Sequence, residues 1–351
     1  MVSAQQPQTT PQQSQSDSPP PRDLYVELPR QPENDWPRHF RVGMLVGLNI
    51  SASFKMGGLF SVSGSQPGAA GVSGVDHVYD DGYVRVDDTG NAQGLTSFWG
   101  YNDASQFNAA GQTLTFHSAN SFAARGSANN DDSPYIGFDM AYGGELWRKG
   151  RMQIGWELGF GLLPIGISDN QAIPAVINRT VHSFQTGGIL PPTAPYNGGP
   201  SGVGPTIQDK ATLLPDDILP GTVTGSRTLD ATLYAIRLGP SLQFELNRHW
   251  AVSVGAGAAV GIVEGELRFD EMIVSGNGAS GRNSGRVGGT DVTFGGYVSA
   301  LVMYHAVENG DVYIGVQYMP LGSAQISGGG REARLNMSGG VYFSAGINWP
   351  F

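Results

Sequence analysis

The sequence contains no cysteine, and only 14% of its 351 residues are charged. Without cysteine the chain has no disulfide framework, no thiolate metal ligand and no cysteine-linked lipid anchor. Soluble domains carry roughly 25% charged residues, so this chain has too few charges for an ordinary water-exposed surface. No stretch approaches the ~18 consecutive apolar residues of a membrane-spanning helix. These absences argue against both a typical soluble domain and a helical membrane protein.

An excess of positive charge is also missing, which narrows the possible partners. The formal net charge is -10, whereas a nucleic-acid-binding surface needs clustered positive charge to contact phosphates. We therefore expect no nucleic-acid partner. Glycine, by contrast, is abundant: its 52 residues are about twice the usual share.

The N-terminal part of the chain differs in composition from the rest. Residues 5–38 are rich in Gln, Pro and Ser and offer little apolar surface to bury, which predicts a disordered segment over 1–38. No signal peptide is evident, but Val2-Ser3-Ala4 resembles the small-residue site at which such a peptide is cleaved. We therefore expect an exported protein whose export signal is missing from this chain.

From residue 39 onward, apolar residues alternate with small or polar ones in eight segments, which predicts β-strands with two unlike faces. The connections between them alternate between tight turns and longer segments. An even number of antiparallel strands with such connections is typical of membrane-spanning β-barrels. The sequence thus predicts an all-β, eight-stranded antiparallel up-and-down transmembrane barrel over 39–351. Its predicted strands are 40–56, 134–147, 151–165, 228–246, 250–270, 290–305, 311–319 and 332–351.

The two faces of these strands differ in side-chain size. Glycines such as Gly159 and Gly257 lie on the polar face, as expected for the narrow lumen of an eight-stranded barrel. The bulky apolar face then points outward to lipid. Aromatic residues on that face are expected to form two girdles, one at each membrane interface. They are Phe40, Phe244, Trp250, Tyr304 and Trp349 at the tight-turn ends and Phe54, Phe138, Phe160, Tyr234, Phe294 and Tyr318 at the other ends.

The chain ends on the alternating segment VYFSAGINWPF, with Phe343, Ile347, Trp349 and Phe351 on one face. Together with the preceding strands, this ending resembles the eight-stranded bacterial outer-membrane proteins of the OmpA/OmpX/OmpW-like superfamily. The resemblance implies that these four residues form the signal read by the barrel-assembly machinery, although Pro350 departs from the usual polar residue. It also implies a monomer in the outer membrane of a Gram-negative bacterium, surrounded by outer-membrane lipid, with short periplasmic turns, periplasmic termini and long extracellular loops.

Nine ionisable residues fall on the predicted inward face of the strands, with nearly balanced signs. Buried charges must be paired, so we expect an ion-pair network that fills the lumen. A gated polar pore is the alternative. The predicted members are Arg41, Lys55, Asp139, Glu145, Glu157, Arg237, Glu245, Glu332 and Arg334.

The two longest connections, 57–133 and 166–227, contain the remaining candidates for chemistry. His117 and His182 lie in them, but sequence spacing does not define a catalytic triad. The stretch YDDGYVRVDDTGN, which includes Asp80 and Asp81, offers oxygen ligands for Ca²⁺. It lacks the EF-hand spacing, so turn residues are the favoured interpretation and metal binding stays open. No cofactor is expected.

These observations favour a non-enzymatic protein. We expect a structural, adhesive or surface-interaction role, with a possible extracellular ligand bound by the connections 57–133 and 166–227. The alternative is a channel for a small solute or a hydrophobic compound. An outer-membrane enzyme acting on lipid or peptide is less favoured.

Overall fold

The computed structural model describes residues 38–59, 75–86, 92–124, 128–130, 134–199, 204–276, 280–307 and 310–350. The chain divides into two units, Met1–Trp36 and Pro37–Phe351, and all described residues belong to the second. The predicted disordered segment therefore lies outside the described residues, apart from Arg38, which begins the first strand.

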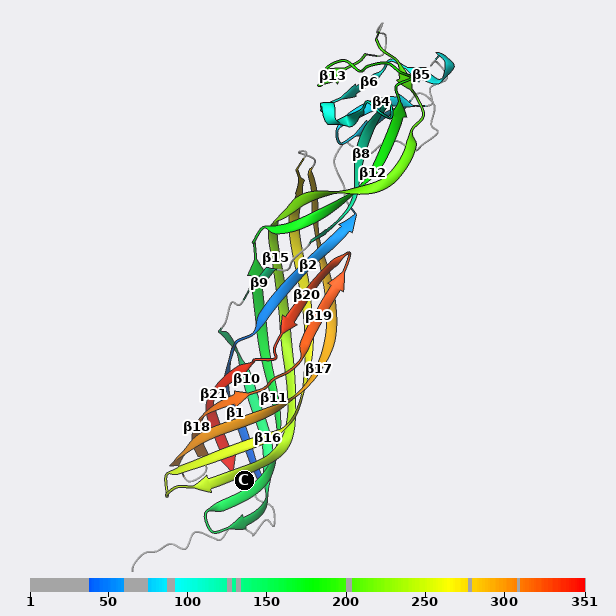
Figure 1. The fold of residues 1–351 in the computed structure, drawn as a ribbon. Coiled ribbons are helices and arrows are strands. Elements are labelled where there is room, and N and C mark those ends of the chain that lie inside the picture. Colours follow the sequence, from blue (N-terminus) through cyan, green and yellow to red (C-terminus); the bar gives the residue numbers. More distant parts are fainter. Residues whose placement is uncertain are drawn as a thin grey trace, which may run out of the picture. The chain divides into compact units, whose positions relative to one another are not determined.

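Eight strands form a closed antiparallel barrel (Figure 1). Each strand pairs with the next around the ring, and the last strand pairs back with the first. The predicted barrel class is therefore confirmed. In ring order the strands are β1 (Arg38–Leu48), β10 (Tyr135–Lys149), β11 (Met152–Asp169), β15 (Thr212–Glu245), β16 (Trp250–Ser275), β17 (Ser280–Val307), β18 (Gly310–Tyr318) and β21 (Val341–Pro350).

The sheet as a whole contains fifteen strands, so the predicted number of eight holds only for this ring. Most of the additional strands come from segments that the sequence pattern left as connections. The ring strands are also longer than predicted, since β16 and β17 continue into the segment between the predicted strands 250–270 and 290–305. The additional strands are β2 (Ser51–Leu59), β7 (Phe107–Asn108), β8 (Thr113–Ala124), β9 (Ala128–Asn130), β12 (Ile173–Gln185), β19 (Ser323–Gly328) and β20 (Arg331–Asn336).

Strand β11 changes its apolar face partway along its length. Up to Leu162 its apolar residues point outward, and Leu158 is 44% exposed. Beyond that point they point inward, and Leu163 is 1% exposed. Two successive apolar residues, Leu162 and Leu163, produce this exchange without any shift in the pairing with β15.

The same exchange occurs at one level in four adjacent strands. Strand pairing aligns Leu162 with Tyr234, Tyr234 with Ile262, and Ile262 with Val292. We call the part of the barrel between this level and the tight turns the lower barrel, and the part beyond it the upper barrel. The lower barrel is apolar outside, whereas the upper barrel is mostly polar outside, apart from exposed residues such as Ile218 and Met272, and encloses the main apolar core. Fully buried members of that core include Ile167, Val223, Val263, Leu267 and Leu335.

Asn49 divides the first predicted strand into β1 and β2. Its backbone is left-handed, with φ 58, and its Nδ2 donates a hydrogen bond to the carbonyl of Gly339 at 2.9 Å. The turn reverses the alternation, so residues that follow it change faces. Phe54, predicted to belong to an outer aromatic girdle, is 1% exposed and lies in the core. That prediction was wrong because it assumed one uninterrupted strand.

A second, smaller sheet lies beyond the upper barrel, and we call it the head. It consists of β3 (Val75–Tyr79), β4 (Gly82–Val86), β6 (Trp99–Tyr101) and β13 (Tyr196–Asn197). Its apolar core includes Trp99 together with Phe116 of β8 and Phe184 of β12, so these two strands connect the head to the upper barrel. The short elements nearby are β5 (Leu95–Thr96), β14 (Ile207–Gln208) and the 3₁₀ helices η1 (Ala92–Gly94) and η2 (Ala104–Gln106).

Candidate functional site

The lumen of the lower barrel contains a buried group of four charges, which we call the lower quartet: Arg41, Asp139, Glu157 and Arg237. Arg237 donates two hydrogen bonds to Asp139, at 2.7 and 2.9 Å. Arg41 donates to Glu157 at 2.7 Å, and Arg237 Nε lies 3.9 Å from the same carboxylate. Two positive and two negative charges therefore neutralise each other where little water can reach them.

The lower quartet fits because its neighbours are small or aromatic. Gly159 faces Arg237 so closely that a Cβ at this position would overlap the guanidinium. On the opposite side, the guanidinium of Arg41 lies 5.1 Å from the ring centre of Tyr313, a favourable cation–π distance. The lumen is thus filled by side chains at this level.

A second buried group, the upper quartet, lies in the upper barrel. Arg227 donates to Asp169 at 2.7 Å and to Glu271 at 3.0 Å, while Arg331 donates to Glu271 at 2.9 Å. Their side chains are at most 3% exposed, and Arg331 also lies over the rings of Phe122 and Phe269. The sequence pattern did not predict these residues, because the predicted strands end before they reach them. The inward phase of β11 and β15, followed past Leu163 and Leu233, would have reached Asp169 and Arg227.

Of the nine ionisable residues predicted in the lumen, the structure brings together only the four of the lower quartet. Glu145 and Glu245 lie at the tight-turn end instead. Lys55, Glu332 and Arg334 were wrongly placed, since they lie on the outer wall of the upper barrel, where Lys55 is 3.8 Å from Glu332. The turn at Asn49 explains Lys55. Glu332 and Arg334 are in β20, whose apolar residues Ala333 and Leu335 point into the core.

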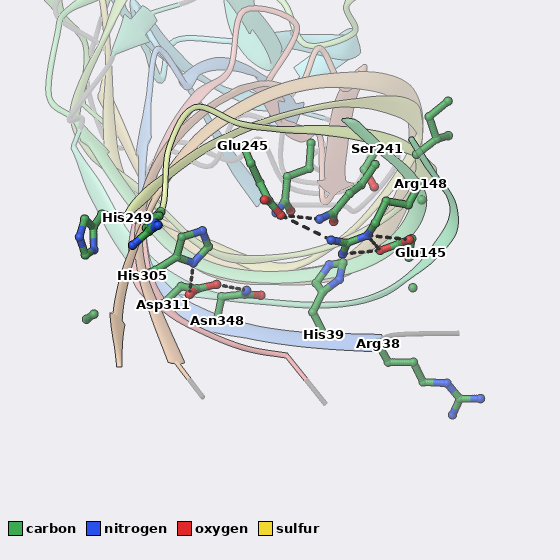
Figure 2. A pocket seen from close by; sticks show the side chains of 17 residues that line it. Arg38, His39, Glu145, Arg148, Ser241, Glu245, His249, His305, Asp311 and Asn348 are labelled. Carbon is green, nitrogen blue, oxygen red and sulfur yellow. Dashed lines mark hydrogen bonds and ion pairs between the residues drawn. The ribbon is translucent and has the colours of Figure 1, made fainter. Parts of the chain in front are cut away.

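A cavity of about 560 Å³, which we call the vestibule, lies at the tight-turn end of the barrel (Figure 2). Each carboxylate in its wall has a partner. Glu145 accepts hydrogen bonds from Arg148, the shortest at 2.7 Å, and Glu245 accepts one from Gln153 at 2.8 Å. Asp311 accepts one from Asn348 at 2.9 Å and lies 2.6 Å from Nδ1 of His305.

Some polar groups of the vestibule have no partner among the described residues. Arg38 and Arg248 lie at its edge and form no ion pair with another described residue, and Arg38 points away from the cavity (Figure 2). Asn348 is 6% exposed, and its Oδ1 accepts no hydrogen bond from the described part of the chain. The vestibule is lined by three arginines and three carboxylates, so their formal charges balance, and its wall also contains an unused acceptor.

Of the residues singled out in the long connections, His117, Asp80 and Asp81 meet between the head and β8. Asp80 and Asp81 accept hydrogen bonds from the backbone N–H groups of Ala119 and His117, at 2.7 and 2.9 Å. Asp81 also lies 2.6 Å from Nδ1 of His117. Burial raises the pKa of Asp80 above its ordinary value. These carboxylates cap the edge of β8, as turn residues do.

His182 lies on the apolar side of the same sheet. Its ring centre is 4.9 Å from that of Tyr79, at the head core. Burial, reinforced by the neighbouring His77 and His117, lowers the pKa of His182 below its ordinary value. The part of the chain that is described holds no group of three or more His, Cys, Asp or Glu side chains placed to bind a metal ion.

The predicted assembly residues lie at the end of β21. Phe343, Ile347 and Trp349 are exposed on the outer wall of the lower barrel, and Phe351 lies outside the described residues. Helices among the described residues are all too short or too polar to cross a membrane.

Comparison with known proteins finds no matching family model and no matching curated protein. Similar solved structures include the Ail protein of Yersinia pestis, with 9% identity, 88% of this chain and 99% of that chain covered, and a TM-score of 0.27. They also include the outer-membrane protease OmpT of Escherichia coli, with 9% identity, coverage of 90% and 96%, and a TM-score of 0.31. A FadL homologue of Pseudomonas aeruginosa has 12% identity, coverage of 89% and 90%, and a TM-score of 0.17. Likenesses this weak say nothing about the role of this chain.

Proposed function

We propose that the chain is an integral outer-membrane β-barrel protein that holds its upper barrel and head outside the cell in a structural or adhesive role. The observation that carries the proposal is the single level at which the apolar face exchanges sides. An apolar outer wall suits lipid and a polar one suits water, so this level fits a membrane interface. Exposed apolar residues below it include Met44, Phe138, Leu158, Leu238, Val254, Val298, Ile314 and Phe343.

The length of the lower barrel supports this placement. In β11 the outward apolar residues extend from Met152 to Leu162, and the paired stretch of β15 extends from Phe244 to Tyr234. Each stretch has about eleven residues, close to the ~9–11 that a tilted strand needs to cross a bilayer.

We propose the orientation from the lengths of the connections. Both ends of the barrel, Arg38 and Pro350, lie at the tight-turn end, and outer-membrane barrels keep their short turns in the periplasm. The head then faces the outside, where it could bind an extracellular ligand. The apolar end of β21 would be recognised by the barrel-assembly machinery.

The packed interior favours this non-enzymatic role over transport. Two neutral, buried quartets and the apolar core between them occupy the barrel along its length. We expect no steady conductance from the protein in planar bilayers. A stable open current would contradict the packed lumen and favour the channel.

The absence of cysteine allows a direct test of the membrane level. Single cysteines would replace Val254 in the lower barrel and Arg268 in the upper barrel, and the protein would be reconstituted in lipid vesicles. A membrane-impermeant maleimide should label R268C and spare V254C. Equal labelling of both would refute the membrane placement. A second labelling experiment in whole cells tests the orientation. The maleimide should label D103C in the head and spare K149C in a tight turn. The opposite pattern would show that the proposed orientation is wrong.

A further inference from the structure

A seam runs between β17 and β19 in the wall of the upper barrel, where the two strands lie side by side (Figure 1). Strand β17 pairs with β16 from Ser280 to Tyr304, but on its other edge the pairing with β18 extends only as far as Val298. Among the described residues, the rest of that edge forms a bridge between Gly295 and Leu321, just before β19. Strand β19 itself pairs only with β20. No hydrogen-bonded ladder therefore joins the described parts of β17 and β19.

Side-chain contacts hold β19 in place along this seam. Ile326 is 2% exposed, and its Cδ1 packs so closely on Gly265 of β16 that a Cβ there would lie only 2.7 Å away. A hydrogen bond also crosses the seam, from the backbone N–H of Gln325 to Oδ2 of Asp291 at 2.8 Å. Regions that few hydrogen bonds tie to the rest of a fold open locally at a low free energy. Separation of β19 from β17 would break few such bonds.

The other strand of the hairpin, β20, is attached more firmly. It forms a ladder with β2 that aligns Arg331 with Met56 and Asn336 with Ser51. Arg331 also donates a hydrogen bond to Glu271 of β16 at 2.9 Å. The hairpin thus has a fixed strand, β20, and a free strand, β19.

The inward face of the hairpin covers the apolar core of the upper barrel. Ala324 and Ile326 of β19, and Ala333 and Leu335 of β20, are at most 2% exposed and belong to this core. A movement of β19 away from β17 would therefore uncover apolar surface that the closed barrel keeps from water.

We propose that the β19–β20 hairpin is a flap in the wall of the upper barrel. It turns about β20, so that β19 leaves β17 and returns while the surrounding strands stay paired. The open state gives water and small solutes access to the apolar core. This inference goes beyond the proposed surface role and does not depend on the membrane placement, because the seam is a property of the strand pairing alone.

The test measures how fast a buried thiol reacts with a small maleimide, since the natural chain contains no cysteine. The full chain is refolded in detergent micelles, and heat modifiability on gels verifies that each variant is folded. A324C places the thiol under the flap, whereas A175C places it in the same core on β12, which is paired on both sides there. We expect A324C to react about ten-fold faster or more, because only the flap opens locally. Equal rates would overturn the proposal.

A disulfide across the seam provides a lock. A Cβ on Gly328 would lie 3.7 Å from Cβ of Val287, a separation that suits a disulfide. Oxidation of A324C/V287C/G328C should leave one free thiol, which should react as slowly as that of A175C. A thiol that still reacts as fast as in A324C would be reached by another route, and the flap would be refuted.

A second variant loosens the seam and needs no disulfide. D291A removes the acceptor of the Gln325 N–H group and should speed the reaction of A324C several-fold. The matched control D270A removes a carboxylate that pairs with Arg282 on the outer wall, and it should leave the rate unchanged. The proposal fails if D291A has no effect on the rate, or if D270A raises it as much as D291A does.

Discussion

Among individual residues, Arg237 has the strongest influence on the lower lumen, because it contacts both carboxylates of the lower quartet. We expect R237M to lower the free energy of unfolding by about 3 to 5 kcal/mol, since it leaves Asp139 charged and buried without a partner. Urea titration in lipid vesicles measures this loss.

Two further variants identify the cause of that loss. The double variant R237M/D139L removes both charges and should recover much of the stability. R268M removes an arginine that is 61% exposed and should leave the free energy of unfolding nearly unchanged, because solvent screens its ion pairs. If R268M lowers the free energy of unfolding as much as R237M does, burial of the lower quartet does not explain the loss in R237M.

At the level of the secondary structure elements, Asn49 determines where β1 ends and β2 begins. A β-branched residue is strained at φ 58, whereas glycine adopts this conformation freely. We therefore expect N49V to be about 1 to 2 kcal/mol less stable than N49G, because both variants lose the hydrogen bond to Gly339 but only valine is strained. Equal stability of the two variants in urea titrations would show that the backbone conformation does not matter.

The attachment of the head to β8 and β12 should depend on pH. The pKa of His182 is lower in the folded protein than its ordinary value of 6.5, so the unfolded head takes up a proton more readily. This contribution to stability is complete above about pH 6.5 and is lost as the pH falls toward the folded pKa. Limited proteolysis at pH 7.5 and pH 5.5 should show faster cleavage of the head at the lower pH.

The variant H182F provides the control for this pH dependence. Phenylalanine keeps a ring against Tyr79 but cannot take up a proton. Its cleavage should change less between the two pH values than that of the natural sequence. An unchanged difference would assign the pH dependence to other groups.

The period-two pattern predicted the lower barrel well because its outer wall is apolar along every strand. The pattern failed to predict the strands beyond the level at which the outer wall changes from apolar to polar. At Leu162 and Leu163 the inward and outward positions of the strand keep alternating without a shift, but the apolar residues move from the outward to the inward positions. A pattern of outward apolar residues therefore stops near this point, although the strand continues. Asn49 was missed because its effect depends on one backbone dihedral, and the upper quartet was missed because the predicted strands end before they reach its residues.

At the scale of the whole barrel unit, the exchange of faces predicts that a substitution by arginine affects stability differently on the lower and the upper outer wall. V254R places a charge on the lower outer wall, where hydrocarbon makes it cost about 2 to 4 kcal/mol. The same change at the exposed Ser284 of the upper wall should be nearly neutral, since the side chain stays in water. Refolding titrations into vesicles compare the two. Equal tolerance would mean that lipid does not surround the lower barrel.

Strand β15 runs without a break through both the lower and the upper barrel, and this continuity has a mechanical consequence. The strand has 34 residues, so at ~3.3 Å per residue it is roughly 110 Å long. A pull on the head along this direction would load its ladders with β11, β12 and β16 in shear, with many hydrogen bonds sharing the force at once. On the proposed placement, the part of the strand in the membrane and the part outside it would resist the force together, so a tether made through the head would stretch little under load.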